Sequence, residues 1–188
     1  MLPLGTPLPA FRLPDYEGRE VSSEEFHTAP GVLVAFICGH CPYVKHMRQE
    51  FAAFAKEYRD RGLAIVGIMS NDAGAHPEDG PAGMKAEAAA VGYTFPYLFD
   101  ESQAVAKSFR AACTPDLFLF DSERKLVYRG QLDSSRPGRG PPRHRAWSAG
   151  GTPPCCSPPT GGPRPGRCRS RGWRRGQCRR LCCCPPPR

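Results

Sequence analysis

Residues 32–44, VLVAFICGHCPYV, join an unbroken apolar run to two cysteines, Cys38 and Cys41, which are separated by two residues. The run has the length and the branched side chains of a buried strand, and from residue 44 onward apolar residues recur at helical spacing. The cysteines therefore stand where a strand ends and a helix begins. A helix N-terminus stabilises a thiolate, and two thiols within one turn can close a disulfide, so the pattern predicts a redox-active pair.

Strand and helix patterns alternate along residues 11–128. Apolar runs typical of strands cover 11–14, 19–21, 32–37, 63–69, 95–99, 117–120 and 126–128, and helical patterns cover 22–26, 44–58, 84–91 and 100–112. Two capping boxes, Ser22 with Glu25 and Asp100 with Gln103, begin the first and last of these helices. Because the last two strands follow one another without a helix between them, the order predicts an α/β fold with a mixed sheet.

The composition divides the chain at residue 136. Residues 136–188 hold 13 of the 26 Lys and Arg residues but none of the 18 Asp and Glu, so the net charge is +13 there and −5 over residues 1–135. The tail also holds 12 Pro, 9 Gly and 7 Cys, and Leu181 is its only large aliphatic residue. Such a segment buries too little apolar surface to offset its ordering entropy. We therefore expect a folded domain over residues 1–135 and a disordered tail over residues 136–188.

The tail also has the character of a shifted reading frame. Arg, Pro, Gly and Ala are encoded by codons rich in G and C, and residues 182–187, CCCPPP, resemble a nucleotide repeat. Under this hypothesis, moving the frame by one base near codon 136 of the gene restores an amphipathic helix. A genuine basic or metal-binding tail is the alternative.

Several classes of protein do not fit the sequence. The overall net charge of +8 comes from the tail, so it does not indicate a nucleic-acid-binding surface on the folded part. Residues 1–135 contain three cysteines, too few for a disulfide-stapled secreted domain. The first nine residues lack a signal-peptide pattern, and no apolar run approaches the roughly 20 residues of a membrane helix. We expect a soluble, cytoplasmic protein with neither nucleic-acid nor membrane partners.

Four separated motifs resemble one family. They are residues 38–46 (CGHCPYVKH), 92–103 (GYTFPYLFDESQ), 112–116 (ACTPD) and 129–133 (RGQLD). Together they are similar to the AhpC/TSA-type, peroxiredoxin-like branch of the thioredoxin superfamily that carries a CxxC motif. The resemblance spans residues 5–138 and implies a thioredoxin fold with an N-terminal hairpin extension. It also implies a thiol oxidoreductase that needs no metal or organic cofactor.

The chain departs from the family pattern at three places. Gly39 stands where members usually have Asn, which gives a Cys-Gly-His-Cys motif similar to that of protein disulfide isomerase. Cys38 and Val34 occupy the places where typical peroxiredoxins have a Thr or Ser and a Pro, which argues against efficient peroxide reduction. The final helix of the family is absent, so we expect an uncovered apolar strip on one face of the sheet.

The resemblance leaves the order of the two thiols open. In a thioredoxin-like mechanism Cys38 attacks, because it stands at the exposed, N-terminal side of the helix, and Cys41 resolves the mixed disulfide. In a peroxiredoxin-like mechanism Cys41 holds the attacking position. Either order implies a disulfide or peroxide substrate and a dithiol electron donor of the thioredoxin or glutathione type.

Four further residues are candidates for supporting roles. His40 lies between the thiols and, when protonated, favours a thiolate. The resemblance implies that the Thr114–Pro115 bond is cis and faces the CxxC motif. Cys113, which precedes this bond, is interpreted either as a third redox thiol or as a small buried residue.

A zinc site is the competing interpretation of the same residues. Cys38, His40, Cys41 and His46 are zinc-ligand types, and two cysteines separated by two residues recur in zinc sites. Such a cluster would make the domain a non-catalytic metal-binding or interaction module.

Overall fold

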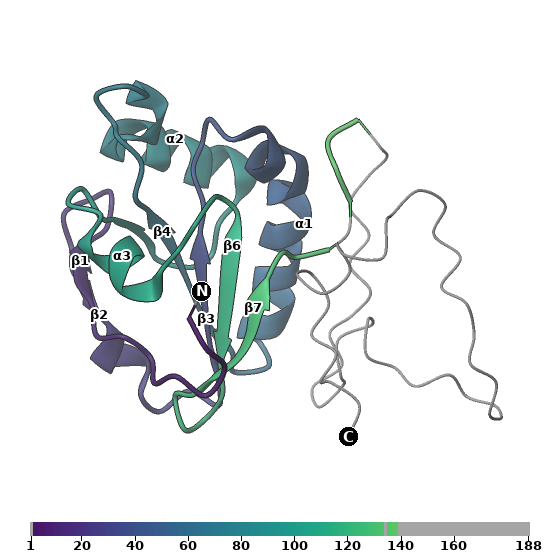
Figure 1. Ribbon diagram of the computed structural model, residues 1–188. Helices are drawn as coiled ribbons and strands as arrows, with labels where there is room; N and C mark the ends of the chain where they lie inside the picture. Colours follow the sequence, from purple (N-terminus) through teal and green to yellow (C-terminus); the bar gives the residue numbers. More distant parts are fainter. Residues whose placement is uncertain (1, 134, 139–188) are drawn as a thin grey trace, which may run out of the picture. The chain divides into compact units, whose positions relative to one another are not determined.

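A five-stranded sheet forms the centre of the part of the chain that the computed structural model describes, residues 2–133 and 135–138 (Figure 1). In chain order the elements are β1 (Arg12–Pro14), β2 (Glu20–Ser22), the 3-10 helix η1 (Ser23–Phe26), β3 (Val32–Phe36), α1 (Pro42–Arg59), β4 (Ala64–Met69), the 3-10 helix η2 (Pro77–Asp79), α2 (Pro81–Val91), β5 (Tyr97–Phe99), α3 (Ala104–Phe109), β6 (Asp116–Phe120) and β7 (Leu126–Gly130).

The strand order in this sheet is β5-β4-β3-β6-β7. β3 pairs with β4 in parallel and with β6 antiparallel, and β7 continues the antiparallel half. All five residues of β3 are buried, as expected of a central strand that is covered on both faces. The predicted α/β class with a mixed sheet is confirmed, and so is the N-terminal hairpin, in which β1 pairs with β2.

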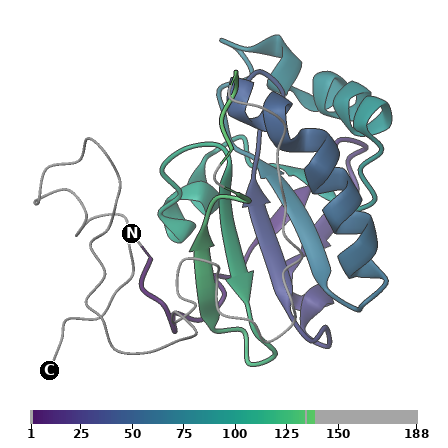
Figure 2. The same ribbon diagram turned by 90° about the vertical axis from the view of Figure 1, so that its right-hand side faces the viewer.

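The helices cover the two faces of the sheet separately. α1 and α2 lie on one face, whereas α3 and the β1–β2 hairpin lie on the other (Figures 1 and 2). Phe109 of α3 lies between α3 and the sheet. Its ring contacts Phe36 and Phe118 edge to face, with its centroid 5.3 Å from that of Phe36 and 5.4 Å from that of Phe118. This aromatic cluster fixes α3 and β6 against β3, the strand that leads to the cysteines.

α1 begins directly after the second cysteine. Cys41 is the N-cap residue, and Pro42 is the first residue of the helix, where its missing N–H costs nothing. The helix buries an apolar face consisting of Val44, Met47, Phe51, Ala52, Phe54, Ala55 and Tyr58. Because β3 ends at Phe36, residues 37–41 connect the strand to the helix at the end of the sheet where β3 and β4 finish.

The two predicted capping boxes have different outcomes. The Ser22–Glu25 box is present and begins η1. The Asp100–Gln103 box is wrong, because Gln103 is itself the N-cap of α3, adopts a left-handed φ of 58° and makes no side-chain cap bond. Asp100 instead reaches further into the helix and accepts a hydrogen bond from the Ala106 backbone N–H at 2.8 Å.

No helix follows β7 within the described residues. On the face that α1 covers, β6 and β7 lie beside the helix without a described helix over them (Figure 2). Leu119 is partly exposed there, and the neighbouring Val127, at an irregularity of β7, is 48% exposed. The expected uncovered strip is therefore small.

The predictions about the tail fall almost entirely on residues 139–188, which lie outside the described part. Among the described helices, none is long and apolar enough to cross a membrane.

Candidate active site

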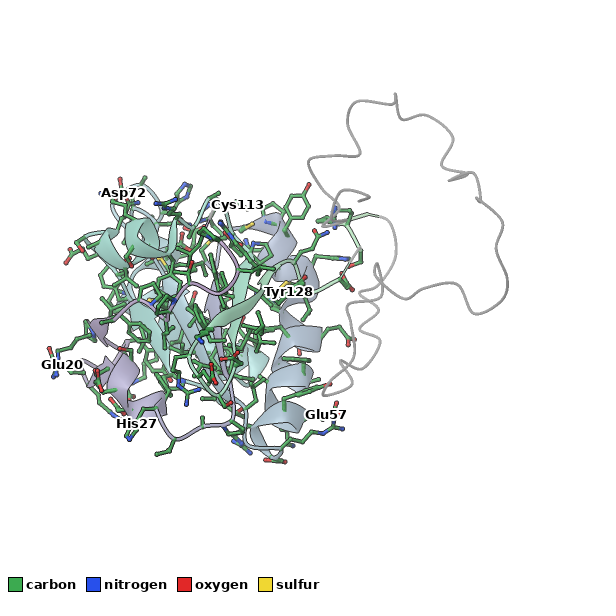
Figure 3. All side chains as sticks on the ribbon, turned by 60° about the horizontal axis from the view of Figure 1, so that its bottom comes forward. Glu20, His27, Glu57, Asp72, Cys113 and Tyr128 are labelled. Atoms are coloured by element: carbon green, nitrogen blue, oxygen red, sulfur yellow. The ribbon has the colours of Figure 1, made fainter. Side chains whose placement is uncertain are left out.

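The candidate site lies where the segment of residues 37–41 meets the loop before β6. Cys113 belongs to this loop and lies at the same end of the molecule as Asp72, which follows β4, whereas Glu57 of α1 lies at the opposite end (Figure 3). The strands thus deliver Cys38, Cys41 and residues 113–115 to one edge of the sheet. In open α/β sheets this edge, at the carboxyl ends of the parallel strands, is where ligands bind.

Thr114 contacts both sulfurs of the CxxC motif. Its hydroxyl lies 3.2 Å from Cys38 Sγ, and its carbonyl oxygen accepts a hydrogen bond from the Cys41 thiol at 3.2 Å. The Thr114–Pro115 peptide bond is cis, which confirms the expectation. Residues that are more than 70 positions apart in the chain therefore form one compact cluster around the two thiols.

The two thiols differ in exposure, and the difference corrects the expectation for Cys38. Cys38 is 0% exposed, whereas Cys41 is 8% exposed and occupies the N-cap of α1. The premise that Cys38 stands on the exposed side of the helix start is therefore wrong. Since α1 begins only at Pro42, Cys38 lies in the loop before the helix, with its side chain buried.

Burial raises the pKa of the Cys38 thiol above its ordinary value. The hydrogen bonds from Thr114 and from the Cys41 backbone N–H oppose this rise, whereas the negative charge of Asp79 adds to it. Desolvation disfavours a buried thiolate, and a nearby carboxylate disfavours it further. At neutral pH Cys38 is therefore held as a protonated thiol.

His40 is fixed by a buried carboxylate that the sequence did not indicate. Its Nδ1 lies 2.5 Å from Oδ2 of Asp79, whose side chain is 0% exposed, and Asn71 donates to the same oxygen at 3.1 Å. Because a carboxylate only accepts, Nδ1 carries the proton and Nε2 is the available nitrogen. The His40 ring also stacks on His76, with centroids 3.9 Å apart.

A second buried carboxylate, Glu87 of α2, lies beside the same loop. A Cβ atom placed on Gly39 would stand 3.3 Å from Glu87 Oε2 and 3.5 Å from Asp79 Oδ1, so both acids face this glycine. Arg48 approaches Glu87 at 3.8 Å, but neither carboxylate oxygen has a hydrogen-bond partner among the described residues. Burial raises the pKa of Glu87, and the charge of Arg48 opposes the rise.

Cys113 is exposed, so its interpretation as a small buried residue is wrong. Burial of part of the side chain, together with the charge of Asp116, raises the pKa of its thiol. The thiol lines a hollow of about 270 Å³ whose apolar wall includes Tyr43, Met47 and Pro115. Thr114, which contacts both CxxC thiols, also lines this hollow.

The zinc-ligand set expected from the sequence does not assemble. His46 is directed toward residue 135, with its Nε2 3.0 Å from Ser135 Oγ. Within the described residues the cluster that does form consists of Cys38, His40 and Asp79, with one ligand atom from each lying within 4.8 Å of the others. Cys41 and His46 of the expected set are therefore not part of this cluster, and Asp79, which was not expected, is.

No sequence pattern indicated a role for Asp79 or Glu87. Asp79 lies in the polar segment of residues 70–81, where an acid is indistinguishable from other turn residues. Glu87 lies in the alanine-rich sequence of α2, where a glutamate is expected on the solvent-exposed face of the helix. Only the packing of η2 and α2 against the loop at residues 37–41 buries them.

Comparisons with known proteins identify the class and the family. The sheet order and the paired thiols define a thioredoxin-fold protein, and the thioredoxin domain of a thiol-disulfide oxidoreductase from Bacteroides vulgatus shares the fold, with 22% identity, a TM-score of 0.57 and coverage of 70% of this chain and 90% of that one. The chain belongs to the AhpC/TSA family, whose model matches residues 4–129. Membership supports thiol oxidoreductase chemistry in general terms.

Two solved structures are much more similar in sequence. A hypothetical protein from Sinorhizobium meliloti 1021 is 51% identical, with a TM-score of 0.73 and coverage of 74% of this chain and 76% of that one. An uncharacterized conserved protein from Geobacillus kaustophilus is 48% identical, with a TM-score of 0.74 and coverage of 77% of both chains. A search of curated proteins finds no match.

Proposed function

We propose that this protein is a thiol-disulfide oxidoreductase in which Cys41 attacks the substrate and Cys38 resolves the intermediate. The observation that carries the assignment is the difference in exposure between two thiols that contact the same residue, Thr114. Cys41 is the more exposed thiol and lies at the N-cap of α1, where the helix dipole stabilises a thiolate. Cys38 is fully buried and protonated, as suits a thiol that acts second.

The reaction proceeds in two exchange steps. The Cys41 thiolate attacks one sulfur of a substrate disulfide, the disulfide bond breaks, and the departing thiolate takes a proton from solvent. Cys38, after losing its proton, attacks the Cys41 sulfur, releases the second substrate thiolate and leaves a Cys38–Cys41 disulfide. A dithiol donor of the thioredoxin or glutathione type then reduces this disulfide and is itself oxidised. We place the cycle in the cytoplasm, where such donors keep thiols reduced.

Peroxide reduction is the second candidate, favoured by family membership. In that reaction the Cys41 thiolate would attack a peroxide oxygen, and Cys38 would then displace water from the sulfenic acid. The Cys41 sulfur faces the carbonyl oxygen of Thr114, which accepts hydrogen bonds and gives none to a departing oxygen anion. Cys38 also occupies the place of the peroxiredoxin hydroxyl residue. Both features make a disulfide the better substrate.

The test compares the two substrates and locates the attacking thiol. We expect reduced protein to turn over a peptide disulfide faster than hydrogen peroxide, at equal concentrations and with the same dithiol donor. Cys38→Ser should accumulate a mixed disulfide at Cys41, located by peptide mass spectrometry, and Cys113→Ser is the control that leaves both thiols in place. Trapping at Cys38 in the Cys41→Ser variant, with none at Cys41 in Cys38→Ser, would reverse the assignment.

A further inference from the structure

We propose that Cys38, His40 and Asp79 form a Zn²⁺ site in the reduced protein. These residues come from the loop before α1 and from η2, and one potential ligand atom from each lies within 4.8 Å of the others. A thiolate, an imidazole nitrogen and a carboxylate oxygen are the three ligand types that zinc takes in proteins.

The cluster is close to the size that zinc requires. Zinc–ligand bonds of about 2.0–2.3 Å place the ligand atoms of a tetrahedral site roughly 3.3–3.8 Å apart. His40 Nδ1 and Asp79 Oδ2, which lie 2.5 Å apart, therefore separate when zinc enters between them, and the Nδ1 proton moves to Nε2 so that Nδ1 becomes the ligand. Cys38 and Asp79 are held in place by burial and by hydrogen bonds, whereas His40, with its side chain 29% exposed, lies on the solvent side. Water or a substrate atom can take the fourth position there.

Glu87 provides an independent reason to expect a cation at this place. Its side chain is 7% exposed, both of its oxygens lack a hydrogen-bond partner among the described residues, and it faces Gly39 together with Asp79. Two buried carboxylates beside one loop are costly unless a positive charge accompanies them. Arg48 lies 3.8 Å from Glu87 and the charge of Lys45 also acts on it, but neither cation forms an ion pair with Asp79 among the described residues.

Binding has a defined chemical balance. Zinc displaces the proton of the Cys38 thiol, which goes to solvent, and the sulfur becomes a thiolate ligand without any change of oxidation state. If the proposed function is correct, a zinc-bound Cys38 cannot resolve a mixed disulfide, so zinc holds the protein in the reduced, inactive form. Removal of zinc by a chelator then restores turnover.

The experiment uses two neighbouring acids as a matched pair. Asp79 is buried and Glu78 is exposed, so Asp79→Asn and Glu78→Gln each remove one negative charge one position apart. The full-length reduced chain and both variants are titrated with Zn²⁺ against a chromophoric chelator. The seven cysteines of residues 136–188 are common to all three proteins and cancel in the comparison.

We expect the wild type and Glu78→Gln to bind one more tight zinc per chain than Asp79→Asn, and zinc to protect Cys38 from alkylation only in the first two. Circular dichroism checks that Asp79→Asn is folded, and if it is not, His40→Gln replaces it, because His40 is partly exposed. Equal zinc content in Glu78→Gln and the ligand variant would overturn the site. Disulfide turnover by the metal-free wild type, measured separately, tests the proposed function alone.

Discussion

The hydroxyl of Thr114 lies 3.2 Å from the sulfur of Cys38, across 76 positions of sequence. This contact stabilises the reduced sulfur more than a disulfide sulfur, which is the weaker acceptor. A hydrogen bond of this kind contributes about 1 kcal/mol. For a two-electron couple, 30 mV corresponds to about 1.4 kcal/mol.

We therefore predict that Thr114→Val lowers the reduction potential of the Cys38–Cys41 pair by roughly 20 mV, which is the hydrogen-bond energy of about 1 kcal/mol converted at 30 mV per 1.4 kcal/mol. The pair is equilibrated in glutathione buffers and its oxidation state is measured by peptide mass spectrometry. Thr114→Ser keeps the hydroxyl and should leave the potential near that of the wild type. Equal shifts in the two variants would contradict the role given to the hydroxyl.

Alkylation should follow the exposure of the three described thiols. In the native, reduced and metal-free protein we expect Cys113 to react first with iodoacetamide, Cys41 more slowly and Cys38 last, because Cys113 is exposed, Cys41 is 8% exposed and Cys38 is 0% exposed. Time-resolved peptide mapping gives the order, and in denaturant the three rates should converge. A native rate for Cys38 above that of Cys41 would remove the basis for Cys41 as the attacking thiol.

The alkylation rate of Cys113 should rise with pH, and the midpoint of this rise should lie above that of an unstructured cysteine. Partial burial and the negative charge of Asp116 disfavour the thiolate, so less thiolate exists at any given pH than in a free thiol. The alkylation rate of Cys113 should keep rising above the pH at which an unstructured cysteine peptide, with a pKa near 8.5, has levelled off. Measuring both in one reaction provides the control. A midpoint at or below that of the peptide would refute the prediction.

Phe109→Ala should destabilise the fold strongly. The ring contacts Phe36, Phe118 and Phe120 and is fully buried, so its removal leaves a cavity between α3 and the sheet. We expect a loss of about 3–5 kcal/mol in the free energy of unfolding, measured by denaturant titration. Val127→Ala, at an exposed position, should change it by about 0.5 kcal/mol or less.

The ion pair between Asp116 and Arg129 should be sensitive to the loss of one partner. The two side chains are 8% and 6% exposed and lie 2.7 Å apart. Asp116→Asn leaves a buried guanidinium without its counter-charge, so we expect a cost of about 3–5 kcal/mol. The exposed pair of Glu57 and Arg61 is the comparison, because Glu57→Gln should cost about 0.5 kcal/mol or less in the same titration.

Several elements were predictable because their patterns are local. The apolar run before Cys38 and the helical periodicity after Cys41 gave β3 and α1, and the Ser22–Glu25 box gave η1. The Asp100–Gln103 box failed because the same residue types serve another purpose, with Asp100 accepting from Ala106 and Gln103 donating to the Ser70 carbonyl. The residue types that cap helices also make other hydrogen bonds, and the sequence does not distinguish the two uses.

The amino-acid sequence by itself determined the class of fold and the pair Cys38 and Cys41, because strand runs, helical spacing and the CxxC motif each lie within a few consecutive residues. Only the tertiary structure decided which of the two thiols is the more deeply buried, how Thr114 contacts both, and which acids lie beside them. Exposure and electrostatic environment depend on segments far apart in the chain: η2 and α2 bring Asp79 and Glu87 to the loop of residues 37–41, and no local pattern records that approach.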